Sequence, residues 1–183
     1  QNVIDKFPFA STPVTATDVG DLTQSRSATA GQSSTTHGYA SGGGGGYSPP
    51  PPGYPLFNTI DKFPFSSDTN ATDVGDLTEA KWKVGQSSTT HGYTSGGGDS
   101  VPNHSNIIDK FPFSTDANAT DVGDLTQART NSGSQSSGTH GYVAGGSDPS
   151  NPDTSGTNII DKFPFSSDGN ATDVGDLTAN SGN

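Results

Sequence analysis

Apolar residues along this chain are concentrated in a short motif that recurs at regular intervals. The motif Ile-Asp-Lys-Phe-Pro-Phe occurs four times, and its copies begin at Ile4, Ile60, Ile108 and Ile160. Each copy is followed by Asp-Val-Gly-Asp-Leu-Thr, which begins at Asp18, Asp73, Asp121 and Asp173. Most of the Leu, Ile, Val and Phe residues lie in these paired motifs. The chain is therefore a repeat protein with its hydrophobic residues in one recurring unit.

Alternation within the first motif predicts a β-strand. In the third copy, one face carries Ile107, Asp109, Phe111 and Phe113, and the other carries Ile108, Lys110 and Pro112. This two-residue period is typical of a half-buried strand. Because proline has no amide hydrogen to donate, we expect the strand at a sheet edge, or with its proline position unpaired.

The segment after this strand predicts a hairpin. Residues 114–118 have the Ser, Thr, Asp and Asn composition of a turn. Asp121–Leu125 then forms a short returning strand, and its glycine suggests a β-bulge. No window shows convincing helical periodicity, so the predicted fold class is all-β.

A third motif completes the repeat. His-Gly-Tyr, followed after two residues by Gly-Gly, begins at His37, His91 and His140. The repeat period is about 50 residues, which is typical of propeller blades. The predicted organisation is a half repeat over 1–23 and full repeats over 24–78, 79–126 and 127–183, in one continuous array. Three and a half copies indicate an open array or an incomplete propeller.

Composition alone favours a different interpretation. Only 26% of residues are hydrophobic, and the chain has 25 Gly and 13 Pro. Such a sequence is expected to be disordered, and a low-complexity tether with sticky motifs is the alternative to an ordered repeat. The concentration of apolar residues favours an ordered repeat with a thin core. Its order should depend on neighbouring repeats, neighbouring subunits or attached glycans.

Charge and residue usage exclude several classes of function. The formal net charge is −11, and the Lys and Arg residues are scattered, so we expect no nucleic-acid partner. No stretch reaches the roughly 18 apolar residues of a membrane span, so we expect no membrane insertion. The absence of cysteine excludes disulfides and thiolate metal sites.

The order of motifs resembles the kelch blade. The resemblance rests on an aromatic strand running into Gly-Gly, a variable loop, a strand, an Asp/Asn turn and a short strand. In the last copy these are Tyr142 with Gly145 and Gly146, then 159–165, 168–170 and 174–177. Arg26 and Arg129 fall where kelch blades often carry arginine. The amino-acid sequences of the motifs are similar to those of kelch-like repeats in tail-fibre and appendage proteins of aquatic bacteriophages and related environmental sequences. This resemblance implies an extracellular or virion-surface location.

Four asparagines lie in N-glycosylation sequons. They are Asn70, Asn103, Asn118 and Asn170. Their predicted turns are exposed, so glycans would fit there. The alternative is that asparagine serves turn geometry, and the first copy, which has Thr15 at this position, shows that the fold does not require the sequon.

The remaining chemical candidates are weaker. The acidic turns that start at Asp68, Asp116 and Asp168 faintly resemble a Ca²⁺ loop, but their spacing favours an Asx-type hairpin turn. The recurring histidines could line a shared channel, although hydrogen bonding is the commoner role. Trp82, Tyr47 and Tyr54 could stack on sugars, although isolated aromatics more often pack locally. No catalytic, cofactor or metal site can be singled out.

These features predict a non-enzymatic structural protein that self-associates head to tail into a fibre or appendage. The expected core and assembly residues are Ile60, Phe63, Phe65, Ile108, Phe111, Phe113, Ile160, Phe163 and Phe165. We expect Phe111→Ser or Phe163→Ser to abolish assembly. The alternative function is a carbohydrate-binding adhesin, with a propeller completed by oligomerisation or by a longer parent chain.

Overall fold

The computed structural model of the chain describes residues 1–9, 14–46, 55–99, 103–148 and 156–181. Within these residues the regular secondary structure is β-strand and no helix is present, so none of them forms a helix that could span a membrane. The strands form antiparallel sheets in which neighbours along the chain are also neighbours in the sheet. The all-β prediction is confirmed.

Each full repeat forms one four-stranded sheet, called a blade below, and the N-terminal half repeat forms a two-stranded sheet, called the half blade. The half blade consists of β1 (Val3–Lys6) and β2 (Thr17–Asp21). Blade 1 consists of β3 (Ala30–Ser33), β4 (His37–Ser41), β5 (Thr59–Pro64) and β6 (Thr72–Asp76). Blade 2 consists of β7 (Trp82–Ser87), β8 (His91–Gly98), β9 (Ile107–Pro112) and β10 (Thr120–Asp124). Blade 3 consists of β11 (Gly133–Ser136), β12 (His140–Ala144), β13 (Thr157–Pro164) and β14 (Thr172–Ser181).

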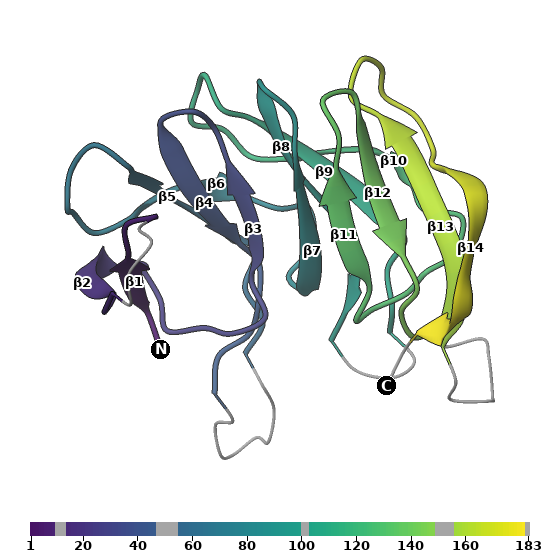
Figure 1. The fold of residues 1–183 in the computed structure, drawn as a ribbon, viewed down its shortest axis with the longest axis horizontal. Helices are drawn as coiled ribbons and strands as arrows, with labels where there is room; N and C mark the ends of the chain where they lie inside the picture. The colour runs from purple at the N-terminus through teal and green to yellow at the C-terminus, as the bar shows by residue number, and fades with distance from the viewer. Residues whose placement is uncertain (10–13, 47–54, 100–102, 149–155, 182–183) are drawn as a thin grey trace.

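The blades lie side by side in an open array (Figure 1). The first strands of the blades, β3, β7 and β11, are adjacent to one another. The half blade lies at one end of the array and β13 and β14 lie at the other (Figure 1). The half blade contains the counterparts of the third and fourth strands of a blade, and it has no counterpart of the first two among the described residues. One edge of β1 is therefore unpaired in this part of the chain.

In the three full blades the strand that leads into Phe-Pro-Phe does not lie at a sheet edge, so for them that form of the prediction is wrong, whereas β1 of the half blade is an edge strand. β5 pairs with β4 on one side and with β6 on the other. Its proline is nevertheless accommodated because Pro64 is the last residue of the strand. Pro64 lies opposite His37 of β4, whereas the pairing with β6 ends at Lys62 and Thr72. The missing amide hydrogen thus falls beyond the β5–β6 ladder, so the proline position is unpaired on the β6 side only, as it stays in register with His37 on the β4 side.

The predicted hairpin and its bulge are confirmed. In blade 2, Asp121 lies opposite Asp109 and Gly123 lies opposite Ile108, so Val122 is the extra residue. The glycine of this motif has a positive φ, which is 152° at Gly75. A Cβ atom at Gly75 would lie only 2.5 Å from the carbonyl oxygen of Ala117 in blade 2. Glycine is required here for backbone conformation and because the next blade approaches closely.

The hydrophobic core lies between the blades. One cluster joins Tyr39, Ile60 and Leu77 of blade 1 to Phe111 and Ala119 of blade 2. The next cluster joins blades 2 and 3 and contains Tyr93, Ile108, Leu125, Val143, Phe163 and Ala171. The third strand of blade 2 is therefore buried on both faces, because Phe111 packs against blade 1 and Ile108 packs in the cluster with blade 3. A half-buried strand was expected, and the difference arises because each blade has a neighbour on both sides.

Candidate functional site: the repeated joint between blades

The same set of contacts links each blade to the next, and we call this set the joint. Its apolar part is an aromatic stack. Tyr39 of β4 stacks on Phe113 with ring centroids 4.8 Å apart and contacts Phe111 at 5.6 Å. Tyr93 makes the equivalent contacts with Phe165 at 4.7 Å and Phe163 at 5.7 Å. The tyrosine of His-Gly-Tyr is thus a joint residue, a role that the sequence analysis did not assign to it.

A backbone and amide contact lies beside the stack. The amide of Asp76 donates to Asn118 Oδ1 at 3.0 Å, and the amide of Ala119 donates to the carbonyl oxygen of Asp76 at 2.8 Å. The other joints repeat the first bond, from Asp21 to Asn70 and from Asp124 to Asn170. Three of the sequon asparagines therefore hold neighbouring blades together.

The sequon asparagines differ in how their side-chain nitrogen is placed. Asn70, Asn118 and Asn170 are exposed and use the oxygen of the side-chain amide in the joint. Asn103 instead donates its Nδ2 to Asp99 Oδ2 at 2.6 Å, and this nitrogen is the atom that a glycan would occupy. Glycosylation stays a prediction, and at Asn103 the nitrogen that would carry the glycan already donates to Asp99.

An ion pair lies at the rim of each joint. The lysine of Ile-Asp-Lys reaches the acidic turn of the following blade, from Lys6 to Asp68 and from Lys62 to Asp116, both at 2.7 Å. Lys110 contacts Asp168 in the same way. The acidic side chains of these pairs are more than half exposed, so each pair contributes about 0–1 kcal/mol. These ion pairs match each lysine to one acidic turn of the following blade, and they contribute little to the stability of the fold.

The aspartate of Ile-Asp-Lys is the buried acceptor of the joint. Asp61, Asp109 and Asp161 have no exposed surface. Asp61 accepts hydrogen bonds from the amide of Thr23 at 3.0 Å and from its hydroxyl at 2.6 Å. Asp161 accepts the same two bonds from Thr126. Because Thr23 and Thr126 come from the end of the preceding sheet, these buried carboxylates link one repeat to the next.

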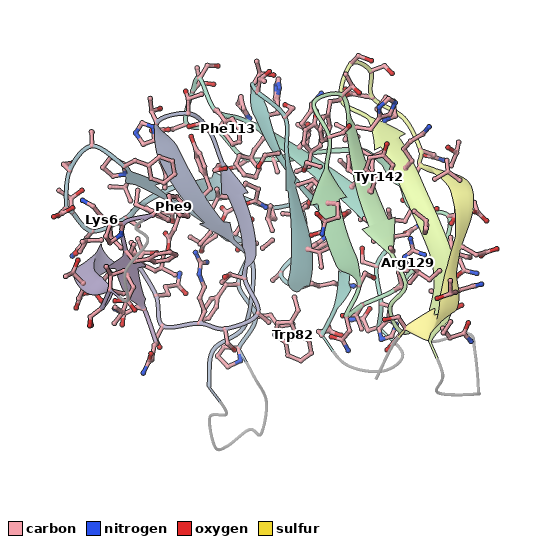
Figure 2. The ribbon with its side chains drawn as sticks, viewed as in Figure 1. Lys6, Phe9, Trp82, Phe113, Arg129 and Tyr142 are labelled. Carbon is pink, nitrogen blue, oxygen red and sulfur yellow. The ribbon has the colours of Figure 1, made fainter. Side chains whose placement is uncertain are left out.

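Arginine neutralises two of these aspartates. Arg26 NH2 lies 2.8 Å from Asp61 Oδ2, and Arg129 NH2 lies 2.8 Å from Asp161 Oδ2. All four side chains are fully buried. Burial lowers the pKa of both arginines, and the neighbouring aspartates oppose that shift. The arginines that carry the kelch resemblance therefore neutralise the buried aspartate of their own repeat and do not form an exposed site (Figure 2).

Blade 2 uses lysines in place of the arginine. Lys83 Nζ lies 3.8 Å from Asp109 Oδ2 and 3.2 Å from Glu79 Oε2, and Lys81 lies 3.6 Å from Glu79 Oε1. Burial raises the pKa of Asp109, and Lys83 opposes the shift. For Glu79, burial alone would raise the pKa, but the hydrogen bond from Ser105 and the charges of Lys83 and Lys81 outweigh it, so the pKa lies below its ordinary value.

This arrangement predicts a pH-dependent contribution of Glu79 to stability. A carboxyl group with a lowered pKa stabilises the fold above its unfolded pKa, and that contribution is lost as the pH falls through the folded pKa. We expect Glu79→Gln to be less stable than the parent chain at neutral pH, and the difference to shrink below pH 4.5, the ordinary value. Urea unfolding of both proteins from neutral pH to below pH 4.5 measures this difference in stability. A difference that stays constant with pH would contradict the role of the charge.

The histidines are not gathered into one site. His37, His91 and His140 begin the second strand of separate blades. Their Nδ1 atoms lie 2.8–2.9 Å from the hydroxyls of the preceding threonines, Thr36, Thr90 and Thr139. Burial lowers the pKa of His91, with the Lys110 charge acting in the same direction. These contacts fit the hydrogen-bonding role of the recurring histidines.

The acidic turns direct their oxygens into turn and joint contacts. Asp73 Oδ1 accepts from the amide of Gly75 at 3.1 Å, which is the bond of an Asx turn. Asp116 and Asn118 of the same motif face Lys62 and Asp76 of blade 1. Among the described residues, no three His, Cys, Asp or Glu side chains lie close enough together to hold a metal ion.

The aromatic candidates for sugar stacking are separated. Trp82 begins β7 and packs beside the glycine loop of blade 1, where its Nε1 lies 2.6 Å from the position of a Cβ on Gly44 (Figure 2). Tyr47 and Tyr54 lie outside the described residues. Trp82 therefore fits the local packing role.

Comparison of the sequence with protein-family models and with curated proteins finds no match. The fold is similar to that of a solved structure, "Structure of YjhT", with a TM-score of 0.71 and 11% sequence identity. The alignment covers 90% of this chain and 56% of that chain, which is a kelch-like β-propeller. At this identity the similarity shows the fold alone. The chain is thus an array of three and a half kelch-like β-repeats that spans 56% of the matched structure.

Proposed function

We propose that this chain is a non-enzymatic structural protein that self-associates as a subunit of an extracellular or virion-surface fibre. One observation supports self-association most strongly. The two ends of the array expose different surfaces: blade 3 presents one side of a joint that has no partner among the described residues, and the half blade presents exposed apolar side chains. The extracellular setting rests on the sequence resemblance to appendage proteins.

The surface at the N-terminal end consists of exposed apolar side chains on the half blade, of which Phe7 and Phe9 line one cavity with Phe63 and Phe65 of blade 1. Phe7 is 58% exposed and Phe9 is fully exposed, although their counterparts in blade 2, Phe111 and Phe113, pack against Tyr39. Val3 and Val14 are also exposed. Exposed apolar groups that are adjacent in space are typical of protein interfaces.

The surface at the C-terminal end is on blade 3. Val174 is 47% exposed, whereas Val74 and Val122 pack against the following blade. Leu177 is half-buried, whereas Leu77 and Leu125 are buried. Association of this surface with the half blade of another copy would be heterologous, and heterologous association forms filaments when it does not close into a ring.

Negative-stain electron microscopy of the purified chain tests this function. We expect rods of mixed length whose size increases with protein concentration, because each copy added to an open assembly leaves both of its ends available for further copies. Monodisperse monomers would contradict the proposal. If such monomers also bind glycans saturably, the adhesin alternative is favoured.

A further inference from the structure

Blade 2 differs from the other two full blades at positions that come together in the fold. The segment that leads into each blade reads Thr-Gln-Ser-Arg before blade 1 and Thr-Gln-Ala-Arg before blade 3, but Thr-Glu-Ala-Lys before blade 2. Lys81 therefore stands where the other repeats have Arg26 and Arg129, and Glu79 replaces a glutamine. Because blade 2 has a full blade on each side, these differences do not arise from its place at an end of the array.

Lys81 does not take over the role of the arginine, because Lys83 is the cation that lies beside the buried Asp109. The amine of Lys81 instead reaches the segment between β8 and β9. Its Nζ lies 3.4 Å from Oδ1 of Asn103 and 3.5 Å from the backbone oxygen of the same residue. The side chain of Lys81 is only 10% exposed. A lysine amine is thus held against an asparagine carboxamide and is largely shielded from solvent.

The corresponding positions of blade 1 do not carry such a pair. The bridge that Gly98 makes to His104 in blade 2 is made to Leu56 in blade 1, so Asn103 corresponds to Pro55. Blade 1 therefore has proline in place of the carboxamide and arginine in place of the amine. The fold of a blade requires neither group, and the pair is a feature of blade 2.

Two carboxylates flank the pair. Glu79 Oε1 lies 3.6 Å from Lys81 Nζ, and the other oxygen of Glu79 accepts from Ser105 Oγ at 2.6 Å. On the other side, Asp99 Oδ2 accepts from Asn103 Nδ2 at 2.6 Å, so the amide nitrogen faces a carboxylate while the amide oxygen faces Lys81. A lysine amine becomes a nucleophile when a neighbouring base removes its proton, and the carboxylate of Glu79 is placed to do so.

We propose that Lys81 and Asn103 join in an intramolecular isopeptide bond. Glu79 takes one proton from the ammonium group of Lys81, and Nζ then forms a bond to Cγ of Asn103. The bond between Cγ and Nδ2 breaks, and Nδ2 leaves as ammonia after taking a second hydrogen from Nζ. The proton held by Glu79 passes to this ammonia, so the products are one amide bond and one ammonium ion. The step consumes no oxidant and no co-reactant, and the fixed geometry replaces a collision between separate molecules.

The bond stabilises a chain that has a thin core. It ties the segment before β7 to the segment between β8 and β9, and it joins residues that are 22 positions apart. Such a cross-link restricts the unfolded chain and thereby favours the folded state. The chain contains no cysteine, so a disulfide cannot supply this constraint. The proposal does not depend on self-association.

Mass spectrometry of the purified chain tests the bond, in a host that does not glycosylate asparagine, because a glycan would occupy the same nitrogen. We expect the mass to be lower than that of the sequence by one ammonia, and a tryptic digest to contain peptides joined through Lys81 and Asn103. The joined peptides should be absent from Lys81→Arg, which keeps the charge but lacks the amine, and from Asn103→Ser. Cyclisation of Gln1 also releases ammonia, but it joins no peptides. A parent chain without joined peptides after prolonged incubation at neutral pH would overturn the proposal.

Glu79→Gln tests the proton acceptor. We expect the fraction of joined chains shortly after synthesis to fall at least about tenfold, because the amide cannot accept the proton of Lys81. Asp5→Asn is the matched control, since it also replaces a carboxylate by an amide but at an exposed position of the half blade. Circular dichroism checks that both variants fold. Equal joined fractions in the two variants would overturn the mechanism through Glu79.

Discussion

Replacing Arg129 by alanine is expected to destabilise the chain by about 3–5 kcal/mol, because it leaves the carboxylate of Asp161 buried without its counter-charge. Both side chains are fully buried and the ion pair is 2.8 Å long. Arg129 also donates to the carbonyl oxygen of Val143, so the substitution removes a contact to the second strand of blade 3. Chemical denaturation followed by circular dichroism measures the change.

Lys110→Ala is the matched control for this prediction. This substitution removes the ion pair between Lys110 and Asp168, and in this pair the side chain of Asp168 is more than half exposed. We expect a loss of no more than about 1 kcal/mol, because solvent already screens the pair. If both variants lost the same stability, burial would not be the reason why the arginine matters.

Replacing Phe111 by alanine is expected to cost about 3–5 kcal/mol, because the ring is 1% exposed and fills the core between blades 1 and 2. Its loss leaves a cavity beside Tyr39. The ring also covers Gly92 of the neighbouring strand, where a Cβ would lie 2.3 Å from it. Thermal or urea unfolding measures the effect.

Phe7→Ala changes the same position of the repeat at an exposed site and serves as the control. We expect little change in the stability of the isolated chain, since Phe7 is 58% exposed. The expectation that Phe111→Ser or Phe163→Ser abolishes assembly stays a prediction. Both rings are buried between blades of one chain, so these variants would disturb the fold as well as any assembly. Equal destabilisation by Phe7→Ala and Phe111→Ala would contradict this assignment.

The predicted core residues fall into two groups that the motif could not distinguish. Ile60, Ile108, Phe111 and Phe163 are buried, in agreement with the prediction. Phe65 is 51% exposed and Ile160 is half-buried. Phe63, Phe113 and Phe165 are also half-buried. Ile160 occupies the motif position of the buried Ile60 and Ile108, and Phe65 occupies that of the half-buried Phe113 and Phe165. Both are more exposed than their equivalents because they lie where the array lacks a covering neighbour. Position in the array decides burial, and this position is not encoded within one copy of the motif.

The roles of the joint residues were also only partly predictable from the sequence. The repetition of Asp, Lys, Asn and Tyr was visible in the sequence, but each was attributed to a turn, a sequon or a strand. Their roles depend on pairs such as Lys62 with Asp116 and Tyr39 with Phe113, which join residues far apart along the chain. The substitutions Thr15 and Ser181 in the terminal copies were the available signal, because they alter joint positions at the two ends of the array.

The repeat, the hairpin with its glycine bulge and the all-β class could be predicted from the amino-acid sequence, because these depend on local patterning and on backbone chemistry within one motif. The position of the proline strand inside the sheet of each full blade and the placement of the core between blades became visible in the folded structure. The structure also decided that the buried aspartates link adjacent repeats. These features arise from the stacking of blades, which buries both faces of a strand and brings together groups about 50 residues apart.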